Sequence, residues 1–307
     1  MLVFRGFSRP VPQATALTIG NFDGVHRGHR ALLERLRAVA QGEGLLPAVL
    51  SFEPHPREFF SPQAAPARLS TLREKLEMLA EEGVALACIG RFDAAFAALP
   101  ARDFITRILV DTLKTAYLII GDDFCFGAGR EGGFATLCAA GERHGFRVER
   151  TASVMADGER VSSSAVRAAL AAGDMERATR LLGHAYAIDG RVAHGDQLGR
   201  TLGFATANIR IKHDHPPLSG VFAVEARGLK DGPHRGVANL GVRPSARQLA
   251  QPLLEVHLFD FCADIYGAHL NVRFEHKLRS EMRFPSFTAL QAQIAQDAES
   301  ARQYFKH

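Results

Sequence analysis

The hydrophobic and polar positions of this chain follow two different rhythms, and the change between them falls near residue 185. From residue 14 to about residue 145, short apolar runs alternate with segments whose apolar residues recur at helical spacing. The runs predict strands at 14–19, 46–52, 84–90 and 117–121, and the periodic segments predict helices at 71–82 and 103–113. This order predicts an α/β domain, in which helices cover both faces of a parallel sheet.

From residue 186 onward the apolar positions form short alternating segments, which predict strands at 187–192, 220–227, 235–240, 253–261 and 271–278. Glycine and proline turns separate them, and this spacing predicts a small antiparallel β-barrel. The apolar face of a final amphipathic helix comprises Phe287, Leu290, Ile294, Ala298, Ala301 and Phe305. We therefore expect two domains, 1–184 and 185–307, with the terminal helix packed against the barrel.

The composition fits two globular domains and narrows the class of ligand. The 307 residues are 47% hydrophobic, enough for two cores. Lysine and arginine exceed aspartate and glutamate by 37 − 33 = 4, and they are scattered, which favours anionic small molecules over nucleic acid. No apolar run predicts a signal peptide or a membrane span. The four cysteines lack a C-x-x-C pair and indicate reduced, partly buried thiols in a cytoplasmic protein. The oligomeric state stays open.

The most informative segment is the turn T-I-G-N-F-D-G-V-H-R-G-H, residues 18–29, between the first predicted strand and a predicted helix. Unpaired N–H groups and the positive helix dipole at such a turn suit a phosphate. His26 and His29 are three residues apart, so both rings can project from one face, and Gly28 leaves the backbone open. The four letters H-x-G-H alone also fit two partly buried histidines on a capped helix, or an i,i+3 pair in a structural zinc site. Together these two interpretations carry as much weight as a phosphate site.

Two further polar turns, 51–56 and 121–124, follow predicted parallel strands, so we expect them at the same sheet edge as the histidines. Residues 127–132 match G-x-G-x-x-G, which makes a dinucleotide site an alternative. The preceding strand ends near Gly121, however, and the dinucleotide fingerprint needs its first glycine directly in the strand-to-helix turn. An ordinary surface loop is the other interpretation.

The segment R-V-S-S-S-A-V-R, residues 160–167, predicts a serine N-cap on a helix that runs to Ala172. Three hydroxyl groups flanked by two arginines at a helix start also suit a triphosphate. Asp174 then caps a short helix to Leu182.

The second half carries a glycine-rich landmark, Gly195 followed by G-R-T-L-G-F-A-T-A-N at 199–208. Its glycines let backbone amides surround phosphates, while Thr206 and Asn208 offer oxygens to a hard cation such as Mg²⁺. In the strand L-E-V-H-L-F-D-F at 254–261, Glu255 faces away from the core if Val256 and Leu258 build it; a solvated strand face is the alternative. No lysine follows a glycine, which excludes a Walker A loop.

Together these motifs resemble the bacterial bifunctional riboflavin kinase/FAD synthetases, whose first half carries the H-x-G-H signature of the nucleotidyltransferase superfamily. The resemblance spans about residues 14–305 and includes G-V-A-N-L-G-V-R-P-S at 236–245 and L-R-S-E-M-R-F at 278–284. Two departures are Ala205 in place of the family's proline, which puts magnesium affinity in question, and Ser245 in place of threonine. The resemblance implies a Rossmann-like α/β domain followed by a small antiparallel barrel with a terminal helix.

The resemblance also implies roles for individual residues. His26 and His29 would be catalytic in adenylyl transfer, and Glu255 would be the general base of the kinase. The implied ATP-binding residues of the adenylyltransferase are Gly20, Asn21, Phe22, Asp23, His26, His29, Asp123, Arg160, Ser163, Ser164 and Arg167. Those of the kinase are Gly195, Gly199, Gly203, Thr206 and Asn208, the last two also holding Mg²⁺, with Arg279 and Glu281 on the flavin side.

The implied function is bifunctional: ATP phosphorylates riboflavin to FMN, and a second ATP adenylylates FMN to FAD with release of pyrophosphate. ATP is then a co-substrate, and riboflavin, FMN and FAD are substrates or products. Two alternatives are a cytidylyltransferase acting on a polyol phosphate and a non-catalytic flavin-binding regulator. None of these readings requires a nucleic acid or membrane partner.

Overall fold

The computed structural model describes residues 1–194, 204–212, 215–243 and 251–306, and it contains two compact units. Unit 1 comprises residues 1–66 and 72–161, and unit 2 comprises residues 67–71 and 162–307. The two short helices between residues 163 and 182 cluster with unit 2. The expected domain boundary after residue 184 stays a prediction.

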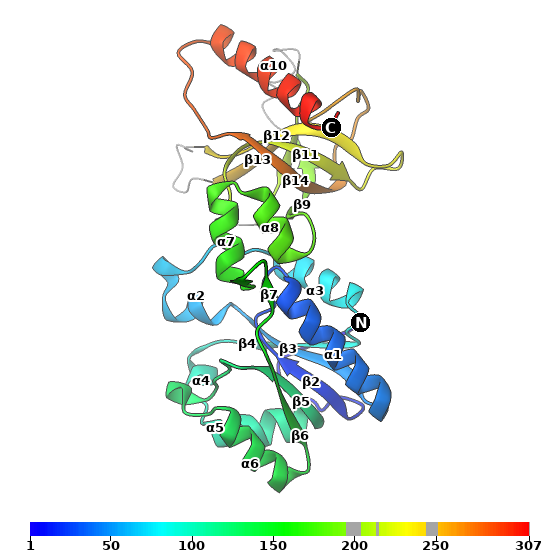
Figure 1. Cartoon of the computed structure of the whole chain (residues 1–307), viewed down its shortest axis with the longest axis vertical. Coiled ribbons are helices and arrows are strands. Elements are labelled where there is room, and N and C mark those ends of the chain that lie inside the picture. The colour runs from blue at the N-terminus through cyan, green and yellow to red at the C-terminus, as the bar shows by residue number, and fades with distance from the viewer. Residues whose placement is uncertain (195–203, 213–214, 244–250, 307) are drawn as a thin grey trace. The chain divides into compact units, whose positions relative to one another are not determined.

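Unit 1 is a six-stranded sheet of order β1-β4-β3-β2-β5-β6, in which all neighbouring strands are parallel (Figure 1). Its strands are β1 (Leu2–Arg5), β2 (Thr15–Ile19), β3 (Leu46–Glu53), β4 (Leu86–Arg91), β5 (Thr115–Gly121) and β6 (Arg147–Thr151). Its helices are α1 (Arg27–Glu43), α2 (Pro56–Phe60), α3 (Leu72–Glu81), α4 (Ala94–Ala97), α5 (Ala101–Asp103) and α6 (Phe134–His144). The hairpin β7 (Met155–Ala156) and β8 (Glu159–Arg160) completes the unit. The predicted parallel α/β domain is confirmed.

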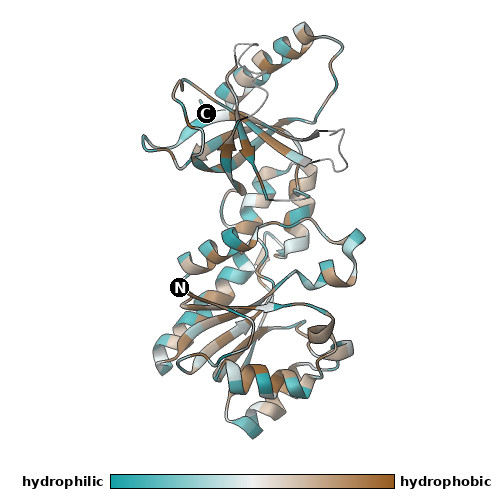
Figure 2. Cartoon of the chain, turned by 180° about the vertical axis from the view of Figure 1, so that it is seen from behind, coloured by the Kyte–Doolittle hydropathy of each residue, from teal (hydrophilic) through white to brown (hydrophobic). Residues whose placement is uncertain are grey.

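The central strand β2 is buried along its whole length, because strands pair with it on both sides and helices cover both faces. Leu17 and Ile19 belong to one core, and Ala16 belongs to the other, as the two-residue period of a strand requires. Leu33 of α1 and Leu79 of α3 lie in the same core as Ala16. Figure 2 shows hydrophobic strands in both units and helices that alternate between hydrophobic and polar residues.

Two predicted helices of unit 1 have different outcomes. The segment predicted at 71–82 is α3, within a residue at each end. The segment predicted at 103–113 is helical, but after α5 it continues as a π-helix, Phe104–Thr112, in which the N–H of Leu113 donates to the carbonyl of Ile108. Strand β1 was not predicted, because it lies at the sheet edge and exposes Leu2 and Val3.

Unit 2 contains a closed barrel of order β10-β13-β12-β11-β14-β9, in which all paired strands are antiparallel. The strands are β9 (Ala187–Ala193), β10 (Ala207–Arg210), β11 (Gly220–Arg227), β12 (His234–Arg243), β13 (Gln251–Leu258) and β14 (His269–Arg279). The helices are α7 (Ser163–Ala172), α8 (Met175–Leu182) and the terminal α10 (Phe287–Tyr304). The predicted antiparallel barrel with a terminal helix is confirmed. The prediction missed β10, which has four residues and begins within the last two residues of the glycine-rich landmark.

Ala298 and Ala301 of α10 pack against Val221, Ala223 and Val237 on the outside of the barrel, as expected for its apolar face. All four cysteines are free thiols; Cys88 is buried, but Cys125 and Cys262 are exposed, contrary to the expectation of partial burial. Among the described residues, no helix combines the length and the hydropathy needed to cross a bilayer.

Candidate active sites

The turn between β2 and α1 is tight and rigidly packed. The φ angles of Phe22, Gly24 and Val25 are 48°, 77° and 37°, and residues other than glycine rarely adopt such positive values. The side chains of Phe22 and Val25 are fully buried, so the core fixes this backbone. The turn therefore presents the start of α1 in one defined geometry.

His26 and His29 form a stacked pair at the start of α1. His26 is the N-cap residue, and its Nδ1 accepts a hydrogen bond from the backbone N–H of His29 at 3.3 Å. The two rings have centroids 3.6 Å apart and planes 11° apart, and the ring of Phe22 lies 4.9 Å from that of His29 on centroids. This arrangement confirms that both imidazoles lie on one face of the turn.

Gly28 is needed between the histidines. A Cβ at this position would lie 3.2 Å from the imidazole of His26 and 3.7 Å from the carbonyl oxygen of Val161. The absent side chain thus relieves a tight contact with the ring of His26, whereas the carbonyl of Val161 lies at ordinary van der Waals distance from this position.

The electrostatics of this turn favour an anion. Burial, the neighbouring His26 and the charge of Lys75 hold the pKa of His29 well below its ordinary value of 6.5. The Nδ1 atom of His29 is buried and has no hydrogen-bond partner among the described residues. The first turn of α1 carries no acidic residue, so no side chain of that turn offsets its positive dipole.

Lys75 is a charged residue of this site that the sequence analysis missed. It is only 4% exposed and lies one helical turn before Leu79 on α3, the helix that shares a core with Leu33 of α1. The signal was present in the sequence, because Lys75 interrupts the apolar stripe of the predicted helix at 71–82.

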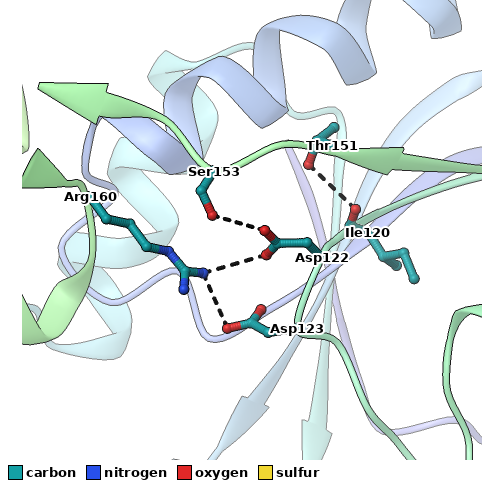
Figure 3. A network of polar contacts seen from close by, with 6 residues as sticks. All are labelled: Ile120, Asp122, Asp123, Thr151, Ser153 and Arg160. Carbon is teal, nitrogen blue, oxygen red and sulfur yellow. Dashed lines mark hydrogen bonds and ion pairs between the residues drawn. The ribbon is translucent and has the colours of Figure 1, made fainter. Parts of the chain in front are cut away.

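The turn after β5 holds Arg160 between two carboxylates (Figure 3). Nη2 of Arg160 donates to Asp122 at 3.4 Å and to Asp123 at 3.3 Å. The hydroxyl of Ser153 donates to the other oxygen of Asp122 at 3.0 Å. The structure thus brings together the predicted residues Asp123 and Arg160, and it adds Asp122, which the sequence analysis did not single out.

The remaining predicted residues of this turn stay close to the histidines. Ser51 of β3 donates to the carbonyl of Asn21 at 3.3 Å, and a Cβ on Gly20 would lie 3.1 Å from the ring of Phe22. Asp23 is 4% exposed. The polar turn at 51–56 therefore meets the histidine turn at the carboxyl edge of the sheet, as predicted.

Phenylalanines gather after β3 and β4. The rings of Phe59 and Phe60 each lie 5.6 Å from that of Phe92, and Phe60 is 65% exposed. Phe52 and Phe96 extend the group toward the core. This partly exposed aromatic cluster offers a flat, apolar surface at the same edge of the sheet.

Ser163, Ser164 and Arg167 lie in α7 of unit 2. The predicted serine cap is confirmed: the hydroxyl of Ser162 accepts from the N–H of Ala165 at 3.2 Å, which leaves Ser163 and Ser164 in the first helical turn. Nε of Arg167 donates to the carbonyl of Ala67 at 2.5 Å.

The glycine-rich segment 127–132 is a closed loop rather than a strand-to-helix turn. Phe126 pairs with Gly132 as an isolated bridge, and the carboxylate of Glu131 accepts from the N–H of Ala101 at 2.7 Å. Because β5 ends at Gly121, the first glycine of this segment is displaced from the position that a dinucleotide fingerprint requires. The zinc interpretation of the histidine pair also lacks support, since no cluster of three or more metal-ligating side chains occurs in the described parts of the chain.

In unit 2, strand register places several predicted residues in one row across the barrel. Asn208 of β10 pairs with Glu255 of β13, and Glu255 pairs with Asn239 of β12. Asn239 pairs with Val221 of β11, which pairs with Arg279 of β14. Residues paired in register share a face of the sheet, so Asn208, Glu255 and Arg279 lie on the same face, in a row around the barrel that we call the catalytic row after the role expected of Glu255.

This face is the outer surface of the barrel. Leu254, Val256 and Leu258 of β13 are buried, whereas the intervening Glu255 is half-exposed, which confirms the predicted alternation. Asn239, the neighbour of Glu255 on the other side, was named in the sequence only as part of the motif at 236–245.

The segment before β10 is fixed by a histidine. The ring Nδ1 of His257 lies 2.9 Å from the carbonyl oxygen of Ala205, and Phe204 meets the His257 ring edge-on at 5.3 Å. Thr206 follows directly and is half-exposed. The predicted residues Gly195, Gly199 and Gly203 lie outside the described residues.

Arg279 is tied to the terminal helix. Its Nε and Nη2 donate to the carboxylate of Asp297 in α10 at 2.9 and 2.7 Å, and the amide of Gln293 donates to the same carboxylate at 2.9 Å. The carboxylate of Glu281 lies against Gly241, where a side chain would collide with it. Both predicted flavin-side residues thus lie beside the barrel wall.

Comparison with known proteins extends over both units. A family model described as FAD synthetase matches residues 8–165, and one described as riboflavin kinase matches residues 182–305. The bifunctional riboflavin kinase/FMN adenylyltransferase of Escherichia coli (strain K12) is 49% identical and covers 99% of this chain and 98% of its own length. The protein of the same description from Haemophilus influenzae is also 49% identical, with 99% of both chains covered.

The crystal structure of a macrolide-efflux protein from Streptococcus pneumoniae superposes with a TM-score of 0.84 at 25% identity, covering 98% of this chain and 99% of that one. Its whole-length match supports the order of elements described above. Both family models and the full-length relatives agree, and the chain belongs to the family of bifunctional riboflavin kinases/FMN adenylyltransferases.

Proposed function

We propose that this chain makes FAD from riboflavin in two steps. The barrel transfers the γ-phosphoryl group of ATP to riboflavin and yields FMN and ADP. The α/β unit then transfers AMP from a second ATP to FMN and yields FAD and pyrophosphate. The observation that carries this proposal is the stacked His26–His29 pair at a helix start, in one chain with a barrel row that holds Asn208 and Glu255.

In the adenylyl step, a phosphate oxygen of FMN attacks the α-phosphorus of ATP, and the bond to the β-phosphate breaks. Negative charge develops on the leaving pyrophosphate, and His26, His29 and the N–H groups of the α1 start would stabilise it. The lowered pKa of His29 leaves its ring neutral in the free protein, so it can gain a proton as the polyanion arrives. Gly20, Asn21, Phe22, Asp23, Asp123 and Arg160 would shape the nucleotide pocket. Ser163, Ser164 and Arg167 are the further residues for which the resemblance implies ATP binding.

The flavin ring of FMN needs a flat apolar surface near this site. The aromatic cluster of Phe59, Phe60 and Phe92 supplies one at the same edge of the sheet, and the exposed Phe60 can stack with the ring.

In the kinase step, Glu255 would accept the proton from the 5′-hydroxyl of riboflavin while that oxygen attacks the γ-phosphorus. The oxygens of Thr206 and Asn208 are the donor types that Mg²⁺ prefers, and Asn208 pairs in register with Glu255, so these residues fit the ion. When bound, Mg²⁺ would neutralise charge on the β- and γ-phosphates. Gly195, Gly199 and Gly203 would enclose the phosphates.

On the flavin side of the kinase, Arg279 would act from a fixed position, because Asp297 holds its guanidinium with two hydrogen bonds. Glu281 would contact the flavin from beside Gly241. The two alternatives are weaker: a polyol-phosphate cytidylyltransferase leaves the catalytic row without a purpose, and a regulator does not need Glu255 and the histidine pair together. The four free thiols accord with a cytoplasmic location.

The test is incubation of the purified chain with riboflavin, ATP and Mg²⁺, followed by chromatography for FMN and FAD. We expect FMN first and FAD later, and omission of Mg²⁺ should stop FMN formation. Incubation with FMN and ATP should give FAD alone. A chain that binds flavin but makes neither product would support the regulator, and activity with CTP and a polyol phosphate would support the cytidylyltransferase.

A further inference from the structure

Asp122 holds two partners at once. One carboxylate oxygen accepts from Nη2 of Arg160 at 3.4 Å, and the other accepts from the hydroxyl of Ser153 at 3.0 Å (Figure 3). Its neighbour Asp123 accepts from the same Nη2 at 3.3 Å but receives no hydrogen bond from Ser153. The side chain of Asp122 is also less exposed than that of Asp123, 43% against 78%. Asp122 is therefore the anchored member of the pair.

The guanidinium of Arg160 is held through one nitrogen only. Both carboxylates accept a hydrogen bond from Nη2. Nε and Nη1 have no partner among the residues that the structure describes. A guanidinium fixed in this way keeps its plane, while its remaining N–H groups stay available for a bidentate contact with a phosphate.

The position of this cluster relates it to the histidine turn. Val161 follows Arg160 directly, and its carbonyl oxygen lies next to Gly28, between the two histidines in the sequence. On the other side, the hydroxyl of Thr151 donates to the carbonyl of Ile120 and ties β6 to the strand end that carries Asp122. Arg160 is thus supported from the carboxyl edge of the sheet.

We propose that Asp122 is a positioning residue of the adenylyl-transfer site: it orients the guanidinium of Arg160 so that Nε and Nη1 meet the triphosphate of ATP. This inference rests on the proposed function of unit 1. A carboxylate next to a polyanion would otherwise repel it, and pairing with Arg160 and Ser153 offsets that repulsion. Asp123, which also accepts from Arg160 but is more exposed, is the carboxylate of the two that can turn toward the ligand itself.

The test is a double-mutant cycle in the full-length chain, with FAD formation from FMN and ATP as the readout. Asp122→Ala should lower kcat about tenfold, because a misoriented Arg160 no longer meets the developing charge. The KM for FMN should change less than about twofold. In the Arg160→Ala background the same substitution should have no further effect, since its target is gone. Asp122→Asn, which keeps an acceptor oxygen, should fall between the wild type and Asp122→Ala.

Asp260→Ala is the matched control, because Asp260 forms a similar exposed pair with Arg302, at 3.0 and 3.1 Å, in the barrel unit. It should leave FAD formation unchanged, and a calorimetric melting curve of the full-length chain should confirm that unit 1 is folded in every variant. If Asp122→Ala does not fold, Ser153→Ala should give a smaller loss that also disappears in the Arg160→Ala background.

Equal losses from Asp122→Ala in both backgrounds, or faster FAD formation by Asp122→Ala, would overturn the positioning role while leaving the proposed function intact. Absence of FAD formation by the wild-type chain would overturn the proposed function, and the inference with it.

Discussion

The imidazole ring of His26 lies almost parallel to that of His29, with 3.6 Å between the centroids and 11° between the planes. Such close stacking leaves little room for two imidazolium charges, because the charges would repel each other across a ring-to-ring contact. His26 is accordingly one of the causes that lower the pKa of His29, and nucleotide binding would supply negative charge that stabilises the protonated form of His29.

We expect His29→Ala to reduce adenylyl transfer by on the order of 10²-fold or more, because it removes a donor aimed at developing phosphate charge. FMN formation by the same protein should be unchanged, since the kinase residues lie in the barrel. Initial rates of FMN and FAD formation measure both effects. His144→Ala, at an exposed histidine of α6, is the matched control and should keep both rates. Loss of both activities in folded His29→Ala protein would contradict the two-site assignment.

The charge state of His29 can be measured directly. Burial, His26 and Lys75 all penalise its protonated form, so its pKa in the free protein should be below 6.5. A non-hydrolysable ATP analogue adds negative charge and should raise that pKa. The readout is a pH titration of the imidazole ¹⁵N resonances, with His29→Gln used for assignment.

The same shift affects stability. As the pH falls below 6.5, His29 is protonated in the unfolded chain before it is protonated in the folded chain. The free energy of unfolding should therefore decrease as the pH decreases. A ring that titrates at or above 6.5 in the free protein would show that the described environment of His29 is wrong.

Glu255→Gln should lower the riboflavin kinase rate by roughly 10²- to 10⁴-fold, because the amide cannot accept the hydroxyl proton. FAD formation from added FMN should continue at the wild-type rate. The matched control is Glu225→Gln, at a half-exposed carboxylate of β11 that accepts from Arg227 and lies off the catalytic row. A kinase rate within about twofold of wild type in Glu255→Gln would assign the base to another residue.

Glu275 offers a prediction about stability. Burial and the nearby Glu225 raise the pKa of Glu275, partly offset by Arg273 and Arg227. A carboxyl group whose pKa is raised on folding destabilises the folded protein once the group ionises. The loss in free energy of unfolding is complete above the pKa of the folded state and is absent below the pKa of the unfolded state. Glu275→Gln should therefore raise the melting temperature of the barrel unit by about 1 to 3 °C at pH 7.5. Calorimetry at pH 4 should find the difference largely gone, and an equal gain at both pH values would exclude charge as its cause.

The sequence predicted the parts of the sites that depend on local pattern. The strand, the turn and the helix around His26 and His29 follow from hydrophobic spacing and a cap, and the outward position of Glu255 follows from strand alternation. The clamp on Arg160 was not predictable, because Asp122 and Arg160 lie far apart in the sequence and meet only through the sheet. The same holds for Asp297, whose pairing with Arg279 depends on how α10 packs.

Besides the edge strand β1, local pattern also failed at β10 and at residues 104–112. The four residues of β10 are too few for alternation to stand out among glycines, although Asn208 lies in that strand. The segment 104–112 has the apolar spacing of an ordinary helix, and only its hydrogen bonds reveal the wider π-turns.

The alignment of Asn208, Glu255 and Asn239 across three adjacent strands limits how the barrel can change in length. Removing or adding a single residue within β12 or β13 would turn Asn239 or Glu255 toward the inside of the barrel, where Leu254 and Val256 lie. The core side chains of the same strand would then face solvent. Natural variation among homologous barrels should therefore spare the interiors of these strands and collect in connections such as 228–233 and 260–268, where a changed count leaves the inside and the outside as they were.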